Sequence, residues 1–159
     1  MFQPCRRFEE AMKHLALLAA LFLAACSSTP QGPKANVPAP EFEIEQTFGP
    51  GDVGYPDGPL DVKYQLRILN RSTIPMTFKR LSLRTVNPAG GAYTLTQPLE
   101  HTFNVPIPPN GEKTVELWAH ARSYGVSMRD REPVTLKGIA YFDTPQGYVN
   151  QPIIQELQQ

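Results

Sequence analysis

The sequence predicts an all-β fold, a single antiparallel β-sandwich of about seven or eight strands that occupies residues 41–159. Apolar residues recur at every second position in several short segments, and this period places one row of side chains in a core and the other towards solvent. Clusters of Gly, Pro, Asn and Asp separate the segments, as expected for tight turns. Beyond residue 25 no segment longer than a turn has a helical period, so the core is expected to form between two sheets.

The expected strands follow from the alternation, taken in order along the chain. The clearest are those at 42–44, 62–68, 115–119 and 134–142. Shorter apolar patterns predict two more strands at 81–83 and 103–107, and two weaker ones at 93–96 and 148–154. Turn clusters lie between them at 49–52, 87–91, 108–111 and 144–147. This spacing favours an antiparallel sandwich.

Two segments sharpen the fold prediction. Residues 66–75, LRILNRSTIP, and residues 107–115, IPPNGEKTV, resemble the strand that ends in Asn-x-Ser and the I-P-P-x-G-x-x-x-V corner of many bacterial immunoglobulin-like domains. The side chains of Asn70 and Ser72 are expected to hydrogen-bond turn amides, and the prolines at 108 and 109 to end the preceding strand. The resemblance implies an immunoglobulin-like or fibronectin-III-like sandwich without the Cys-Trp-Cys signature of antibody domains, and such a fold by itself implies no function.

The N-terminal quarter carries an apolar run, residues 15–25, LALLAALFLAA. Its length of about eleven residues is too short for a transmembrane helix, which needs roughly 20, and fits the hydrophobic region of a secretory signal. The run is apolar on every face, and no second helical pattern is present to pack with it. We therefore expect residues 1–25 to be a signal peptide. Lys13 precedes the run, whereas Glu9 and Glu10 are unusual in a signal, so Met12 is an alternative initiator.

The run ends in Leu23-Ala24-Ala25-Cys26, which resembles the lipobox of bacterial lipoproteins. The resemblance implies that Cys26 takes a diacylglyceryl group, that the signal is cut just before it, and that the new amino terminus is acylated. Two acyl chains suffice for stable membrane anchoring. Ser27, the next residue, implies sorting to the outer membrane of the bacterial cell envelope, with the domain facing the periplasm. The other cysteine, Cys5, precedes the run, so the mature chain has no second thiol.

Residues 26–40 are expected to be the lipidated cysteine and a flexible tether. The stretch 27–40, SSTPQGPKANVPAP, is rich in Pro, Ser, Ala and Gly and has no periodic apolar pattern. Such a composition is typical of an extended, solvated linker. The tether would hold the domain off the membrane.

The sequence offers no catalytic constellation. Two histidines, His101 and His120, remain after maturation, without the spacing of a transition-metal site. Ser82, His120 and Asp143 form a nominal Ser-His-Asp set, but no G-x-S-x-G nucleophile elbow supports it. We therefore expect neither an enzyme nor a cofactor.

A glycine-rich segment, residues 49–61, contains Asp52, Asp57 and Asp61. Carboxylates among glycines are able to ligate Ca²⁺, but the segment does not match an EF-hand. A turn whose aspartates make local hydrogen bonds is the favoured interpretation. No metal site is predicted.

Charge is unevenly distributed although the formal net charge is zero. Every charged residue is acidic from 41 to 61 and basic from 62 to 99. Lys63 and Arg67 share strand parity, so they could form a basic stripe that meets anionic headgroups, lipopolysaccharide or an acidic partner. The favoured alternative is that the acidic first strand lies beside the basic ones and neutralises them. A neutral chain in this compartment is not expected to bind nucleic acid.

The outer row of the strand at 115–119 supplies further candidates for partner binding. Trp118 and His120 alternate with core residues, and Arg122 and Tyr124 follow; exposed Trp and Arg are enriched at binding hot spots. Ordinary packing of Trp118 under a covering loop is the favoured alternative.

The expected function is that of a lipid-anchored cell-envelope protein whose non-catalytic domain binds an envelope protein or has a structural role there. The alternative is a small-ligand or glycan-binding accessory module of an envelope enzyme or transporter. A concave aromatic pocket would favour glycan binding, and a flat, apolar exposed edge would favour a protein partner.

Overall fold

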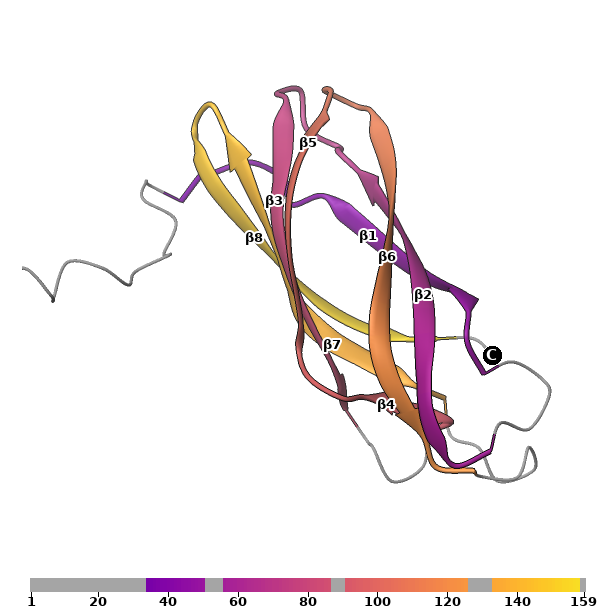
Figure 1. Cartoon of the computed structure of the whole chain (residues 1–159). Coiled ribbons are helices and arrows are strands. Elements are labelled where there is room, and N and C mark those ends of the chain that lie inside the picture. The colour runs from indigo at the N-terminus through magenta and orange to yellow at the C-terminus, as the bar shows by residue number, and fades with distance from the viewer. Residues whose placement is uncertain (1–33, 51–55, 87–90, 126–132, 158–159) are drawn as a thin grey trace, which may run out of the picture. The chain divides into compact units, whose positions relative to one another are not determined.

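The computed structural model describes residues 34–50, 56–86, 91–125 and 133–157, and all of its regular elements are β-strands (Figure 1). The eight strands are β1 (Glu41–Phe48), β2 (Gly58–Leu69), β3 (Met76–Val86), β4 (Tyr93–Leu95), β5 (Leu99–Ile107), β6 (Glu112–Ser123), β7 (Thr135–Thr144) and β8 (Gly147–Glu156). They form two four-stranded antiparallel sheets, ordered β1-β2-β6-β4 and β5-β3-β7-β8. We call these the first and the second sheet. The predicted all-β sandwich of about seven or eight antiparallel strands is confirmed, with eight strands.

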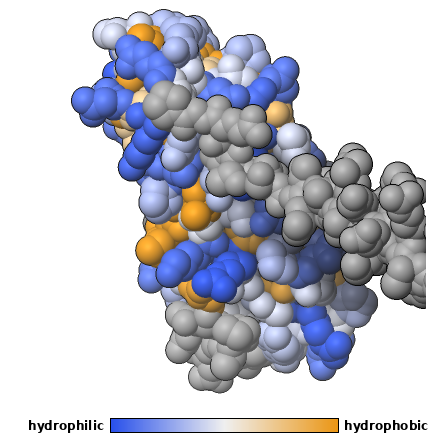
Figure 2. Space-filling view, turned by 90° about the vertical axis from the view of Figure 1, so that its left-hand side faces the viewer, coloured by the Kyte–Doolittle hydropathy of each residue, from blue (hydrophilic) through white to orange (hydrophobic). Residues whose placement is uncertain are grey.

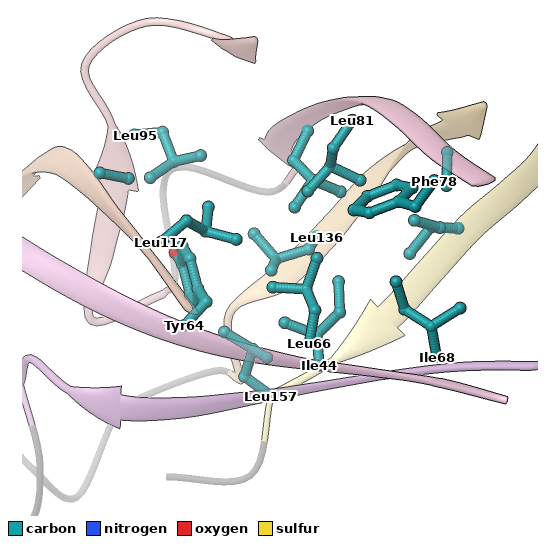
Figure 3. Close-up of a cluster of buried hydrophobic side chains, with 14 of the residues drawn as sticks. Ile44, Tyr64, Leu66, Ile68, Phe78, Leu81, Leu95, Leu117, Leu136 and Leu157 are labelled. Atoms are coloured by element: carbon teal, nitrogen blue, oxygen red, sulfur yellow. The ribbon is translucent and has the colours of Figure 1, made fainter. Parts of the chain in front are cut away.

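The core lies between the sheets, and the period-two alternation decides which side chains enter it. In β2 the odd-numbered Lys63, Gln65 and Arg67 point away from the core, whereas the even-numbered neighbours Val62, Tyr64, Leu66 and Ile68 are fully buried. Phe78, Leu81 and Leu136 of the second sheet meet them from the other side (Figure 3). Burial of such side chains contributes about 1.5–3 kcal/mol each.

An aromatic cluster fills one part of this core. The ring of Phe78 stacks on Phe103 at 4.4 Å and on Phe142 at 5.2 Å between centroids. Phe42 of β1 meets Phe78 edge-on at 5.8 Å, so the cluster joins the two sheets. Such pairs add about 0.5–1.5 kcal/mol beyond burial.

The turn after β2 and the corner between β5 and β6 are bound together through Asn70, which is fully buried. Its Nδ2 donates to the carbonyl oxygens of Ile74 at 2.9 Å and Pro108 at 3.0 Å. Its Oδ1 accepts from the amide and the hydroxyl of Ser72 at 2.9 and 2.7 Å. The predicted turn role of Asn70 and Ser72 is confirmed, and the contact with the Pro108 corner was not predicted. Asn110, in that corner, has φ of 51°, a left-handed conformation that Asn tolerates well.

The chain joins the domain earlier than the composition indicates. The backbone amide of Ala35 donates to the carbonyl oxygen of Tyr148 at 2.8 Å, and Lys34 forms a parallel bridge with the same residue. Ala35 is buried, and Val37 packs against the core. Residues 34–40 therefore differ from the predicted tether of 26–40, because Ala35 and Val37 provide an apolar row too short to be recognised as a strand. Residues 26–33 lie outside the described residues.

One side of the sandwich is closed by a side chain. Gln155 of β8, an edge strand of the second sheet, accepts from the amide of Ile44 at 2.9 Å and donates to its carbonyl at 2.5 Å. Ile44 lies on β1, the edge of the first sheet. The glutamine amide thus takes the place of a strand partner and links the two edges.

Candidate functional site

The outer face of the first sheet carries most of the residues that the sequence indicates for partner binding. Strand register places Phe48, Lys63 and Trp118 in one row across β1, β2 and β6. The neighbouring rows pair Asp61 with His120 and Pro59 with Arg122. Tyr124 follows the end of β6 and is exposed.

Trp118 is the centre of this face. Its side chain is 56% exposed, so the favoured expectation of ordinary packing is wrong. The reason is that residues 97–100, the connecting segment beside Trp118, line a groove with its ring and leave more than half of the side chain open. Its ring rests on that of Phe48, with 5.4 Å between centroids, and Lys63 Nζ lies 5.8 Å from the ring centre. Phe48 is itself 51% exposed. The two rings form an aromatic patch, Phe48 and Trp118, that water contacts on its outer side.

The basic side chains of this face are neutralised within the fold, but mainly by acidic residues of β6 and only in part by the acidic first strand that the favoured alternative names. Lys63 Nζ lies 2.7 Å from Glu116, and Arg67 contacts Glu112 at 2.8 Å and Glu43 at 3.6 Å. The hydrogen bond from Arg67 to Glu112 raises the pKa of the guanidinium. The predicted stripe of Lys63 and Arg67 is therefore a ladder of alternating charge.

The same neutralisation extends along the sheet. His120 Nδ1 lies 2.6 Å from Asp61, and Arg122 donates to Asp57 at 3.2 Å. At the other end Arg71 donates to Glu41 at 3.0 Å, which lowers the pKa of that carboxyl. All of these pairs are exposed, and exposed pairs contribute little to stability, about 0–1 kcal/mol.

Beside Trp118, the edge of β6 is open. β4 pairs with β6 only at Ala121–Ser123, and the amide of Thr96 adds one more bond to the carbonyl of His120 at 3.0 Å. After Thr96 the chain turns away from β6 and continues into β5 of the second sheet. Among the described residues no strand pairs with this side of β6 between residues 113 and 119. Unpaired backbone groups along a strand edge are a template for an incoming strand.

An open groove of about 400 Å³ lies where the segment that follows β4 turns away from β6. Trp118 and His120 form one side of it, and Gln97, Pro98, Leu99 and Glu100 form the other. The groove offers one aromatic ring together with amide, carboxylate and imidazole groups. It is a shallow surface feature and not an enclosed cavity.

The structure includes a site residue that sequence reasoning missed. Phe48 would share the inward parity of Ile44 and Gln46 in a regular strand. A register irregularity between Gln46 and Phe48 turns Phe48 to the outer face. No local signal in the sequence marks this irregularity, since it depends on the pairing with β2.

The nominal catalytic and metal-binding sets are not brought together. Ser82 lies on the second sheet and donates to Glu100 at 2.5 Å, whereas His120 lies on the first sheet beside Asp61. Of the three aspartates considered for Ca²⁺, Asp57 and Asp61 are engaged with Arg122 and His120, and Asp52 lies outside the described residues. Within the described ranges no group of three His, Cys, Asp or Glu side chains is placed to hold a metal ion.

The lipobox residues Leu23, Ala24, Ala25 and Cys26 also lie outside the described residues. In the part of the chain that is described, no helix has the length and hydrophobicity needed to cross a membrane.

Comparison with known proteins gives distant structural likenesses only. No family model and no curated protein matches the chain. A crystal structure of structural genomics target SoR45 is similar with a TM-score of 0.49 and 14% identity, over 76% of this chain and 87% of that one. A Bordetella pertussis protein described under the name ApaA, target BeR40, is similar with a TM-score of 0.45 and 15% identity, over 78% of this chain and 94% of that one.

Proposed function

We propose that this chain is a lipid-anchored protein of the bacterial cell envelope, whose β-sandwich binds another envelope protein without catalysing a reaction. One observation carries the binding role: the exposed aromatic patch of Phe48 and Trp118 lies next to the stretch of β6 that no described strand pairs with. An incoming strand would gain backbone hydrogen bonds from β6, and its side chains would cover Trp118. Trp is among the residues most enriched at binding hot spots.

We also propose that the sandwich is of the immunoglobulin or fibronectin-III type. The order β1-β2-β6-β4 is similar to the A-B-E-D sheet of immunoglobulin domains, and β3-β7-β8 to their C-F-G sheet. β5 is then an added strand beside β3. Domains of this type commonly present strand edges and loops to partners, which agrees with a binding role.

The membrane anchor rests on the lipobox. Replacing Cys26 by serine removes the sulfur that would take the diacylglyceryl thioether, so the variant should remain an unprocessed precursor that does not incorporate radioactive palmitate. Wild type should incorporate palmitate, run smaller on a gel and fractionate with the outer membrane. Identical processing and localisation of Cys26→Ser would contradict the anchor.

The partner surface is tested by photocrosslinking in the native envelope. Benzoylphenylalanine in place of Trp118 should give a defined protein adduct, identified by mass spectrometry. Benzoylphenylalanine in place of Thr102, an exposed residue of β5 on the other sheet, is the matched control. Adducts that are the same at both positions, or none at position 118, would refute a partner surface on β6.

A second candidate function is glycan binding, favoured by the groove beside Trp118. An exposed indole next to the carboxylate of Glu100 and the imidazole of His120 suits a sugar ring, which stacks its apolar face on an aromatic ring and hydrogen-bonds at its rim. Trp118 is the only tryptophan of the chain, so its fluorescence reports directly on this groove. A saturable change with peptidoglycan fragments, reduced in Glu100→Gln, would favour the glycan; no change leaves the protein partner as the better proposal.

A further inference from the structure

The outer face of the second sheet combines exposed apolar and basic side chains. Register places Arg84, Lys137 and Ile154 in one row across β3, β7 and β8, and Ser82, Ile139 and Pro152 in the next. Ile154 is 71% exposed, the highest value among the large hydrophobic residues described, and Ile139 is 38% exposed. In the row beyond, the guanidinium of Arg80 lies over the ring of Tyr141, 4.2 Å from its centre. We call Arg80, Arg84, Lys137, Ile139, Tyr141 and Ile154 the basic apolar face.

Figure 2 views the molecule from the side on which β8 lies in Figure 1. It shows hydrophobic residues exposed among strongly hydrophilic ones. A charged surface in which large aliphatic side chains remain open to water marks an interaction site more often than a scattered single residue does.

The charges of this face are not neutralised in the way those of the first sheet are. Arg84 and Lys137 are direct cross-strand partners, an arrangement of like charges that is unfavourable. Neither forms an ion pair with an acidic side chain of the described residues.

Glu100 and Glu156 lie in the rows on either side of Arg84 and Lys137, and neither forms an ion pair with them. Glu100 accepts from Ser82 at 2.5 Å, Asp143 lies 3.8 Å from Lys79, and Glu156 is paired in register with Thr135. An external anion placed between Arg84 and Lys137 would therefore relieve their repulsion.

The position at which the chain enters the domain indicates which anion is near. Lys34 and Ala35 join the domain at Tyr148, on the edge strand that also carries Ile154. Lys34 follows Cys26 by eight positions, so the chain between them spans at most about 28 Å. With a lipid on Cys26, the end of β8 that carries Tyr148 is held within about 28 Å of the membrane surface.

We propose that the basic apolar face docks on the anionic headgroups of the membrane in which the protein is anchored. Arg84 and Lys137 contact lipid phosphates, Ile154 and Ile139 enter the boundary between headgroups and acyl chains, and Tyr141 lies at the same level. Docking through the second sheet turns the first sheet, with Trp118 and the open edge of β6, away from the membrane and towards a partner. The inference rests on the proposed lipid anchor and adds to it an orientation of the domain.

The test uses the processed lipoprotein in vesicles of phosphatidylethanolamine and phosphatidylglycerol in which the phosphatidylethanolamine is brominated, so that it quenches nearby tryptophan fluorescence and stays present when phosphatidylglycerol is exchanged. Wild type is the internal control, because its only tryptophan lies on the opposite sheet and should not be quenched. The double variant Trp118→Phe, Ile154→Trp should be quenched. Each added substitution, Arg84→Gln or Lys137→Gln, should lower the ratio of docked to undocked domain about fivefold, because a basic side chain near an anionic surface contributes about 1 kcal/mol.

Several results would overturn the docking. They are an unquenched Ile154→Trp variant, equal quenching of wild type, and quenching that survives the charge substitutions or the replacement of phosphatidylglycerol by phosphatidylcholine. A second copy of the protein could cover the basic apolar face instead of the membrane, and light scattering of the protein in detergent tests this. A dimer that shields position 154 would also overturn the docking.

The lipid anchor is judged separately, by palmitate incorporation. If wild type takes up no palmitate, the anchor proposal fails, and flotation of the same chains with anionic vesicles decides the docking. Flotation that falls in high salt and in the Arg84 and Lys137 variants supports the basic apolar face, and absence of flotation refutes it.

Discussion

Asn70 is the polar side chain on which the fold depends most directly. Its amide makes four hydrogen bonds to two separate turns while being fully buried. A side chain that satisfies all its donors and acceptors inside a protein is costly to remove, because its partners are left buried and unpaired. This explains why an Asn, a residue more common at surfaces, is found here with no exposed atom.

We expect Asn70→Ala to lower the free energy of unfolding by about 2–4 kcal/mol, since several buried groups lose their partners at about 1 kcal/mol or more each. Asn104→Ala is the matched control. Asn104 is exposed and accepts one bond from Lys79, so its loss should change stability by less than about 0.5 kcal/mol. Urea denaturation measures both. Equal losses of unfolding free energy in the two variants would mean that the buried hydrogen bonds of Asn70 stabilise the fold no more than one exposed hydrogen bond does.

Two buried tyrosines give the protein a pH dependence at the alkaline end. The hydroxyl of Tyr64 lies 2.9 Å from that of Tyr93, which donates to Gln46 Oε1 at 2.6 Å. Burial raises the pKa of both phenols above the ordinary value near 10. Above about pH 10 the unfolded chain releases these protons and the folded one keeps them, so the unfolded state binds fewer protons. Stability therefore falls as pH rises.

The expected loss above about pH 10 approaches 1.4 kcal/mol per pH unit for each tyrosine. Tyr64→Phe removes one of the two groups, so the slope of unfolding free energy against pH should be about half as steep. Phe142→Leu, a core change without a phenol, should lower stability at every pH and leave the slope unchanged. Urea titrations between neutral and alkaline pH measure these slopes, and an unaltered slope in Tyr64→Phe would show that the phenol also ionises when folded.

At the scale of elements, the edges of the two sheets are treated differently. β1 and β8 are joined by Gln155, whose amide pairs with both backbone groups of Ile44. β6 has no such closure beside Trp118 in the part of the chain that the structure describes. Free edges promote aggregation. A free edge next to an exposed aromatic patch is therefore consistent with the proposed binding of a partner strand.

Gln155→Ala should expose the amide and carbonyl of Ile44 and lower stability by about 1–3 kcal/mol. Gln151→Ala is the control, because the Gln151 amide contacts only the carbonyl of the adjacent Pro152. Hydrogen exchange of the Ile44 amide should accelerate in the first variant and not in the second. Unchanged exchange in Gln155→Ala would mean that β1 is held by β2 alone.

At the scale of the whole molecule, the domain is expected to fold without its lipid. Residues 41–159 contain all eight strands and should give a monomer with a β-rich circular dichroism spectrum. Residues 34–159 should be more stable by about 1–2 kcal/mol, because they add the buried Ala35 and its hydrogen bond to Tyr148. Thermal unfolding of the two fragments measures the difference. Equal midpoints would place the start of the domain at residue 41, as the composition indicates, and a helical spectrum would refute the sandwich.

The sequence by itself determined that the domain is built of antiparallel strands and, where a strand is regular, which row of its side chains is buried. Alternation in β2 and β7 fixed which side chains enter the core, because successive residues of a strand point to opposite faces whatever the strand pairs with. The turn role of Asn70 and Ser72 was also predictable, because their side chains hydrogen-bond groups only a few positions away in the chain.

Only the tertiary structure decided which strands are neighbours, and the candidate surfaces depend on that. The pairing of β1 with β2 sets Glu43 against Arg67 and turns Phe48 outward beside Trp118. The pairing of β3 with β7 sets Arg84 against Lys137. The early departure of β4 leaves β6 open. These contacts join residues far apart in the chain, and their free energies are shared among many weak interactions, so no local pattern of the sequence encodes them.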